Sequence, residues 1–132
     1  MVESGALESA ALIAFLAVSD LDRAERFYGH ALGLMLRDER PFALVTQVGG
    51  TQLRITAAAT VAAAPHTVLG WAVSDLDATI DDLASRGVVF TRYDGMDQDE
   101  RAIWTSPNSA RVAWFADPDG NNLSLTQFPA AD

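Results

Sequence analysis

The sequence contains no cysteine and no lysine. Without cysteine the chain can form no disulfide, and it has no thiolate to bind a metal or to act as a nucleophile. Its nine positive charges are therefore all arginines, and 18 aspartates and glutamates oppose them, which gives a net charge of −9. This acidic balance disfavours nucleic acid and anionic membranes as partners, because both carry negative charge themselves.

Long apolar runs are also missing, since none approaches the roughly 20 residues that a transmembrane helix needs. The apolar run that ends at Val18 follows Glu3 and Glu8, where a signal peptide would carry basic residues. We therefore expect a cytoplasmic protein. A length of 132 residues with 49% hydrophobic residues is typical of one globular domain, residues 1–132.

One short segment of the sequence occurs twice. Residues Ala17–Asp22 read Ala-Val-Ser-Asp-Leu-Asp, and the same six residues return at Ala72–Asp77. In both copies an apolar run precedes the segment and a helical pattern follows it. A repeat that occurs only twice indicates a duplicated half-domain rather than a solenoid. The two halves are residues 11–57 and 66–128, joined by an alanine-rich linker at 57–65.

Each half is predicted to form a strand, a helix and three further strands, which is an α+β fold. A helix follows each repeat, begins at Ser19 or Asp20 in the first half and at Ser74 or Asp75 in the second, and ends before a glycine. A tight glycine turn at 49–50 and a type I turn at 117–120 precede the last strand of each half. The predicted strands are 12–18, 34–38, 42–48 and 51–56, then 67–73, 88–93, 110–116 and 122–128. The irregular stretch 94–108 has room for one more short strand at 102–105.

This order of elements resembles the vicinal oxygen chelate superfamily, which includes glyoxalase I, bleomycin-resistance proteins and extradiol dioxygenases. The resemblance rests on Val-Ser-Asp-Leu before each helix, on Phe27-Tyr28 and Leu32-Gly33, and on Asp-Pro-Asp-Gly-Asn at 117–121. It covers about residues 11–128. It implies two βαβββ modules whose sheets curl into a ligand-binding cup, and a homodimer whose cups are completed across or between subunits.

The resemblance also implies four metal-ligand positions, a His or Gln early in each half and a Glu in the last strand of each half. In this sequence they fall on Ile13, Arg54, Val68 and Ser124. Isoleucine and valine cannot coordinate a metal, arginine repels one, and a neutral serine is a poor ligand. We therefore predict no metal and no other cofactor. His66, two residues before Val68, is either a displaced ligand or a histidine on the rim.

The alternation of side chains along strands predicts what lines the cup instead. If Ile13 faces the cup, Phe15 on the same strand does so as well. Arg54 either anchors a carboxylate, phosphate or carbonyl oxygen of a ligand or pairs with an internal acid. A mostly apolar lining with a few polar groups is typical of a small-molecule site. The same alternation adds three further residues, His66, Val68 and Ser124.

Aromatic residues complete the predicted site. Trp104 lies in an irregular segment that, by the resemblance, borders the mouth of the cup, and it either stacks on a ligand or packs beneath a loop. Only one of Trp114 and Phe115 can face inward, and a four-residue turn favours Phe115 together with Arg111. Tyr93 is placed at the edge of the cavity.

Two further groups of residues are assigned away from the site. Trp71 falls on the side that faces the helices and is predicted to belong to the core. The acidic segment from Asp94 to Glu100 lacks the spacing of an EF-hand and is interpreted as a solvated loop.

We therefore predict a metal-independent binding protein of the bleomycin-resistance type, with no catalytic residues, that sequesters a small, partly planar organic molecule. The enzymes of the superfamily rely on the Lewis acidity of their metal. The alternative is a glyoxalase-like lyase or isomerase, or an enzyme related to the dioxygenases. Such an enzyme would work without metal, with Arg54 as the electrophile, or with relocated metal ligands.

Overall fold

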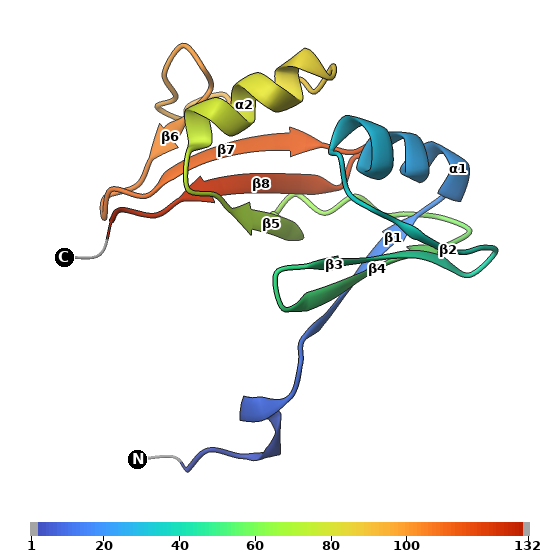
Figure 1. Ribbon diagram of the computed structural model, residues 1–132. Helices are drawn as coiled ribbons and strands as arrows, with labels where there is room; N and C mark the ends of the chain where they lie inside the picture. The colour runs from blue at the N-terminus through green and yellow to red at the C-terminus, as the bar shows by residue number, and fades with distance from the viewer. Residues whose placement is uncertain (1–2, 131–132) are drawn as a thin grey trace.

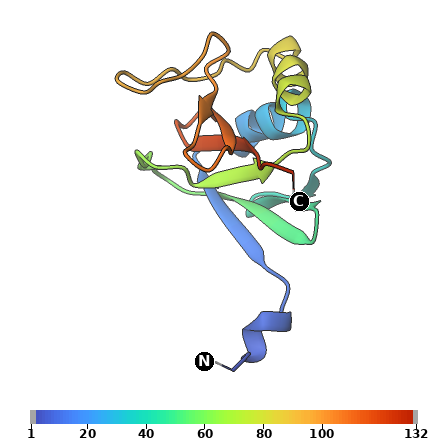
Figure 2. The ribbon, with the colours of Figure 1, turned by 90° about the vertical axis from the view of Figure 1, so that its left-hand side faces the viewer.

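The computed structural model describes residues 3–130 and has the predicted α+β fold of two βαβββ modules (Figure 1). The first module comprises β1 (Ile13–Val18), α1 (Leu21–Ala24) with the π-helical segment η2 (Glu25–Ala31), β2 (Arg37–Glu39), β3 (Ala43–Val48) and β4 (Thr51–Ala57). The second comprises β5 (Leu69–Ala72), α2 (Leu76–Ser85), β6 (Trp104–Thr105), β7 (Arg111–Ala116) and β8 (Asn122–Gln127). A 3-10 turn, η1 (Ala6–Ser9), precedes them in an N-terminal segment that projects away from both modules (Figure 2).

The two modules have the same strand topology. Their sheets have the orders β1-β4-β3-β2 and β5-β8-β7-β6. In each sheet the first strand of the module runs parallel to the last, and the other neighbours are antiparallel. Figure 1 shows α1 and α2 on the same side of the sheets. The opposite face of each sheet is therefore the one that can form a cup.

Both helices begin at the second of the two capping residues that the sequence allowed. The Asp20 carboxylate accepts a hydrogen bond from the backbone N–H of Arg23 at 3.1 Å, and that of Asp75 accepts one from Ala78 at 3.0 Å. A carboxylate at this position satisfies a free N–H group and opposes the positive end of the helix dipole. The first helix ends at Gly33, which has a φ of 75° that a residue with a Cβ rarely adopts.

The faces of the sheets that turn toward the helices share one hydrophobic core. Leu16 and Val18 of β1 are buried, whereas Ile13 and Phe15 are 48% and 68% exposed on the opposite face. Trp71 packs against the core, as predicted, and its ring stacks on that of Phe115. The core joins residues of both modules, among them Leu53, Ile55, Leu83, Leu123 and Leu125.

A buried hydrogen-bond network ties the turn between β7 and β8 to the first module. The Asp117 carboxylate accepts hydrogen bonds from the Tyr28 hydroxyl at 2.7 Å and from the Asn121 side-chain amide at 2.8 Å. The same Asn121 amide donates to the backbone carbonyl of Ala17 at 2.9 Å. Burial raises the pKa of Tyr28, and the hydrogen bond to Asp117 raises it further, so the phenol stays protonated and donates.

Asp119, in the same turn, extends this network to the surface. Its carboxylate accepts hydrogen bonds from the backbone N–H of Ser19 and from the Arg23 guanidinium, each at 3.0 Å. Asp117, Asp119 and Asn121 therefore fix the position of the second module against the first helix. We call the following residues the inter-module lock: Ser19, Arg23, Tyr28, Asp117, Asp119 and Asn121.

Two predicted strands are corrected by the structure. Residues 88–93 form no strand, and Phe90 makes only an isolated bridge with Phe115. The apolar side chains of Val88 and Phe90 are accommodated by packing against the core rather than by regular strand pairing. In the first module, β2 is shorter than the predicted strand 34–38 and begins at Arg37. Within residues 3–130, no helix has the length and apolar character needed to cross a membrane.

Candidate ligand-binding site

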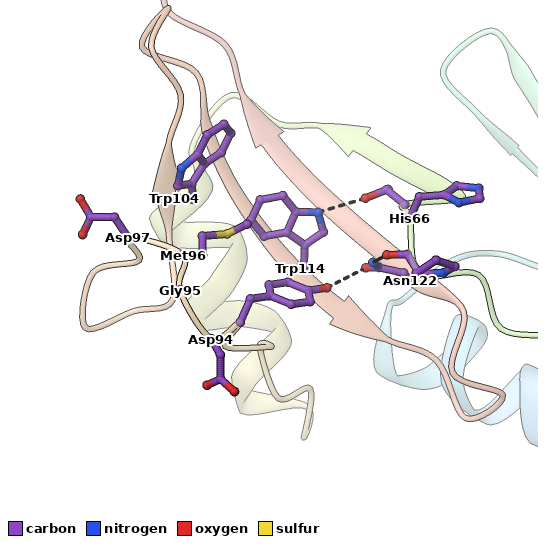
Figure 3. Close-up of a pocket in the computed structure, with 11 residues that line it drawn as sticks. His66, Asp94, Gly95, Met96, Asp97, Trp104, Trp114 and Asn122 are labelled. Carbon is purple, nitrogen blue, oxygen red and sulfur yellow. Dashed lines mark hydrogen bonds between the residues drawn. The ribbon is translucent and has the colours of Figure 1, made fainter.

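A cavity of about 820 Å³ lies on the face of the second sheet that turns away from α2 (Figure 3). It is built from β7, β8, the first residue of β6, the segment before β5 and the loop that follows Tyr93. A site of this size suits a small organic molecule. Its lining residues are Pro65, His66, Thr67, Tyr93, Asp94, Gly95, Met96, Asp97, Trp104, Trp114 and Asn122.

Three aromatic rings form one wall of the cavity. The Tyr93 and Trp114 rings meet edge to face, with centroids 5.6 Å apart and an interplanar angle of 85°. The Trp104 ring is tilted by 39° against Trp114, with centroids 6.1 Å apart. Edge-to-face and tilted contacts are favourable because the positive ring edge meets the negative ring face.

Hydrogen bonds hold two of these rings in place. The Trp114 indole N–H donates to the Thr67 hydroxyl at 3.0 Å, and the Tyr93 hydroxyl donates to the Asn122 side-chain oxygen at 3.3 Å. Thr67 precedes β5, and β8 lies between β5 and β7, so the Trp114 indole extends across β8 to reach Thr67. The wall is therefore ordered before a ligand arrives, which lowers the entropy cost of binding.

The loop that closes one side of the cavity is fixed by Gln98. The Gln98 side chain accepts a hydrogen bond from the Tyr93 backbone N–H at 2.8 Å. Its amide donates to the carbonyls of Thr91 at 3.0 Å and Ala102 at 2.9 Å. Met96, within this loop, lines the same cavity as Trp114, and its thioether extends toward that ring in the view of Figure 3.

The charged side chains that line the cavity are acidic. Asp94 and Asp97 are exposed, and their carboxylates point away from the rings (Figure 3). No arginine is among the lining residues. A ligand at this wall therefore meets aromatic faces, while the carboxylates lie at the rim and in solvent.

Three of the predicted ligand-contacting residues line this cavity, and the others lie elsewhere. His66, Tyr93 and Trp104 are in it. Phe15 and Val68 are exposed on the same faces of the sheets but outside the cavity. Ser124 is only 8% exposed. It packs so closely on Gly70 that a Cβ added to Gly70 would lie 2.5 Å from the Ser124 hydroxyl oxygen.

Arg54 forms an internal ion pair. Its guanidinium lies 3.0 Å from the Glu39 carboxylate and donates to the Gln52 side-chain oxygen at 3.2 Å. Glu39 also accepts from Arg37 at 2.7 Å. The hydrogen bonds from Arg37 and then from Arg54 lower the pKa of Glu39. Of the two roles that the sequence allowed for Arg54, the structure contains the pairing with an acid.

The prediction that Phe115 and Arg111 face the cup is wrong. Phe115 is 1% exposed and lies in the core, and Arg111 lies 3.1 Å from Asp77 of α2. The strands pair with Ala116 opposite Asn122, so the turn between them has five residues rather than four. One additional residue in a turn inverts which side chains face the cup. Trp114 therefore faces the cavity.

The residues at the four metal positions do not fit a divalent cation. Ile13, Arg54 and Val68 offer no donor atom to a metal, and the hydroxyl of Ser124 is packed against Gly70. In residues 3–130, no group of three or more histidine or acidic side chains is placed to hold a metal ion.

The acidic loop is organised by its own backbone. The Asp99 carboxylate accepts hydrogen bonds from the backbone N–H groups of Arg101 at 2.9 Å and Ile103 at 3.0 Å. Asp94, Asp97, Asp99 and Glu100 are all exposed to solvent. These bonds are those of a turn-forming aspartate.

Sequence reasoning missed Trp114, Met96 and Thr67 as parts of the site. Met96 lies in no strand, so alternation could not place it, and Thr67 precedes β5, so the predicted strand 67–73 assigned it to the wrong face. Asn122 carried a usable signal, because the alternation along the last strand places it on the cup side. Whether Trp114 or Phe115 lies on the same face as Asn122 depends on the length of the turn between the two strands.

Comparisons with known proteins agree with this architecture. A family model described as the glyoxalase/bleomycin resistance protein/dioxygenase superfamily matches residues 10–125. A glyoxalase/bleomycin resistance protein from Catenulispora acidiphila is 27% identical, with a TM-score of 0.70 over 92% of this chain and 100% of that one. A superfamily member from Sphaerobacter thermophilus is 24% identical, with a TM-score of 0.69 over 90% and 97%.

A protein from Bacillus anthracis assigned to the glyoxalase family shows how far the fold extends beyond sequence similarity. It is 14% identical, with a TM-score of 0.72 over 98% of this chain and 100% of that one. The comparison with curated proteins finds no match.

Proposed function

Since this chain belongs to the glyoxalase/bleomycin resistance protein/dioxygenase superfamily, and its metal positions carry no suitable donors, we propose that it is a metal-independent binding protein. It holds a small, partly planar organic molecule and so sequesters it. The observation that carries this proposal is the ordered wall of Tyr93, Trp104 and Trp114 beside a cavity of about 820 Å³. Flat aromatic faces bind flat molecules by stacking.

The side chains at the four metal positions support a role in binding rather than in metal-assisted catalysis. A metal enzyme needs its cation to polarise a carbonyl or to stabilise an enolate-like intermediate. Hydrocarbon side chains at Ile13 and Val68 and the guanidinium of Arg54 supply no metal ligand. The guanidinium is itself a possible electrophile, but it is engaged by Glu39 at 3.0 Å.

Titration calorimetry with fused-ring aromatic compounds tests the proposal. We expect Trp104→Ala to weaken the binding of a planar ligand by roughly 3- to 10-fold, because one aromatic contact is lost. Two matched controls should leave the affinity unchanged. Trp71→Phe alters a ring on the opposite face of the sheet, and Arg54→Gln removes one positive charge from the first module.

Two results would contradict this proposal. If Arg54→Gln weakened binding more than Trp104→Ala did, the ligand would lie against the first module instead. Stoichiometric metal in the purified protein, or turnover of a hemithioacetal substrate, would favour the glyoxalase-like enzyme.

We also propose that the protein forms a homodimer through the cup faces of its sheets. Ile13, Phe15 and Val68 support this proposal, because these apolar side chains are 48%, 68% and 40% exposed on those faces. Neighbouring exposed apolar side chains often mark an interface. Sedimentation velocity should find a dimer for the natural protein and a monomer for Phe15→Arg. The dimer would be refuted by a monomer at every concentration tested.

A further inference from the structure

The cavity holds acidic and aromatic side chains together, and no arginine is among its lining residues. From this combination we infer that its ligand is a planar organic cation, such as a fused-ring heteroaromatic with a quaternary nitrogen. The inference rests on the proposed function, because it assumes that a planar molecule binds at this wall. A cationic ligand excludes the alternative in which Arg54 anchors an anionic group of the ligand.

Three side-chain donors of the cavity lining are used within the protein. The Trp114 N–H donates to Thr67, and the Tyr93 hydroxyl donates to Asn122. The Asn122 amide in turn donates to the Pro65 carbonyl at 3.5 Å. The Thr67 hydroxyl, the His66 ring, the Trp104 indole N–H and the second N–H of the Asn122 amide remain as side-chain donors among the lining residues, and none of them carries a fixed positive charge. A carboxylate or phosphate ligand would therefore lose its hydration without gaining a cationic partner.

Arginines near the site are occupied as well. Arg54 belongs to the first module, where Glu39 pairs with it at 3.0 Å. Arg101, at the end of the acidic loop, forms an ion pair with Asp81 of α2. Arg92, at the start of that loop, donates to the backbone carbonyl of Asp99. None of the three lines the cavity, so the carboxylates of Asp94 and Asp97 are the formal charges closest to a ligand there.

A planar cation would bind favourably at this wall, whereas an anion would bind poorly. The face of an aromatic ring is negative, and tryptophan binds cations most strongly of the three aromatic residues. Trp104 and Trp114 both contribute to the wall. Asp94 and Asp97 would act through space, because their carboxylates point away from the rings (Figure 3). With the net charge of −9, they raise the local concentration of a cation, and salt screens this effect.

Three acridines of the same shape separate charge from planarity. The probes are N-methylacridinium, acridine at a pH where it is neutral, and acridine-9-carboxylate, each titrated calorimetrically into the full chain. We expect N-methylacridinium to bind roughly 10-fold more tightly than acridine, and the carboxylate to bind most weakly. Added salt should weaken the binding of the cation and leave that of neutral acridine unchanged.

A pair of charge-matched variants locates the effect. Asp94→Asn with Asp97→Asn should weaken N-methylacridinium roughly 3-fold and leave acridine unaffected. The control, Glu3→Gln with Glu8→Gln, removes the same charge from the exposed N-terminal segment and should change neither affinity. Equal affinity for the cation and neutral acridine, or tighter binding of the carboxylate, would overturn the inference alone. An absence of binding by all three probes would overturn the proposed function with it.

Discussion

The two modules share their topology but use the same face of the sheet in different ways. In the first module, Arg37 and Arg54 both form ion pairs with Glu39. In the second, the corresponding face carries the ring of Trp114 and an open cavity of about 820 Å³. Duplication therefore preserved the backbone, which the core requires, while the residues that face away from the core diverged. The function of a fold depends on those outward-facing residues.

The turns before the last strands differ in the same way. In the first module, Val48 pairs with Thr51, so only Gly49 and Gly50 form the turn, and a Cβ at either glycine would have no atom within 4 Å. In the second module, five residues form the turn, and three of them, Asp117, Asp119 and Asn121, belong to the inter-module lock. Beside the short turn lies a cavity of about 430 Å³ whose lining includes Gly49 and Trp71.

The inter-module lock is connected to the candidate site through Asn121. Asn121 is the residue that makes the second turn one longer than expected, and it bonds both Asp117 and the carbonyl of Ala17. With Asn121 in the turn, Trp114 rather than Phe115 faces the cavity. The long turn thus both joins the modules and determines which aromatic ring lines the site.

The largest expected effect comes from removing the centre of the lock. Asp117→Ala leaves the buried Tyr28 hydroxyl and the Asn121 amide each without a partner on that carboxylate. Because each buried polar group left without its partner costs about 1–3 kcal/mol, we expect the free energy of unfolding to fall by about 3 kcal/mol. Denaturant unfolding measures this change, and Tyr28→Phe, which removes one bond, should cost about half as much.

The matched change in the other module is Gly50→Ala. Its new Cβ would meet no atom within 4 Å, and we expect a change of about 1 kcal/mol or less. If Asp117→Ala were no more destabilising than Gly50→Ala, the two turns would be equivalent. The contrast between the modules would then be wrong.

Short-range patterns in the sequence were enough to predict the fold. The repeated hexamer located both helices. Their caps, Asp20 and Asp75, were also predictable from the sequence, because each capping bond spans only three residues. Alternation correctly placed Leu16 and Val18 toward the core and Phe15 away from it. These features depend on neighbours along the chain, so the sequence contains the information directly.

The candidate site was only partly predictable because its geometry depends on distant contacts. Trp114 faces the cavity because of the length of the turn that contains Asn121. The Asn121 side chain is hydrogen-bonded to Ala17, 104 residues earlier in the chain. The pairing of Arg54 with Glu39 likewise depends on β4 and β2 lying on either side of β3 in one sheet. Both contacts join segments that lie apart in the sequence, and no local pattern marks them.

A smaller effect should appear on acidification, and it separates Asp119 from other surface acids. Desolvation alone raises the pKa of Asp119, but the hydrogen bonds from Ser19 and the charge of Arg23 outweigh it and hold that pKa below the ordinary 3.8. A carboxyl group whose pKa is lowered by folding stabilises the protein above its unfolded-state pKa. That stabilisation is lost as the pH falls through the folded-state pKa.

Asp119→Asn should therefore lower the free energy of unfolding by about 1 kcal/mol at neutral pH, with a difference from the natural protein that shrinks below pH 3.8. Denaturant unfolding at a series of pH values measures this difference. Asp94→Asn is the control, because it removes the same charge from an exposed position at the cavity rim and leaves the lock intact. A difference that stayed constant down to low pH would show that the Asp119 carboxylate contributes nothing through its charge.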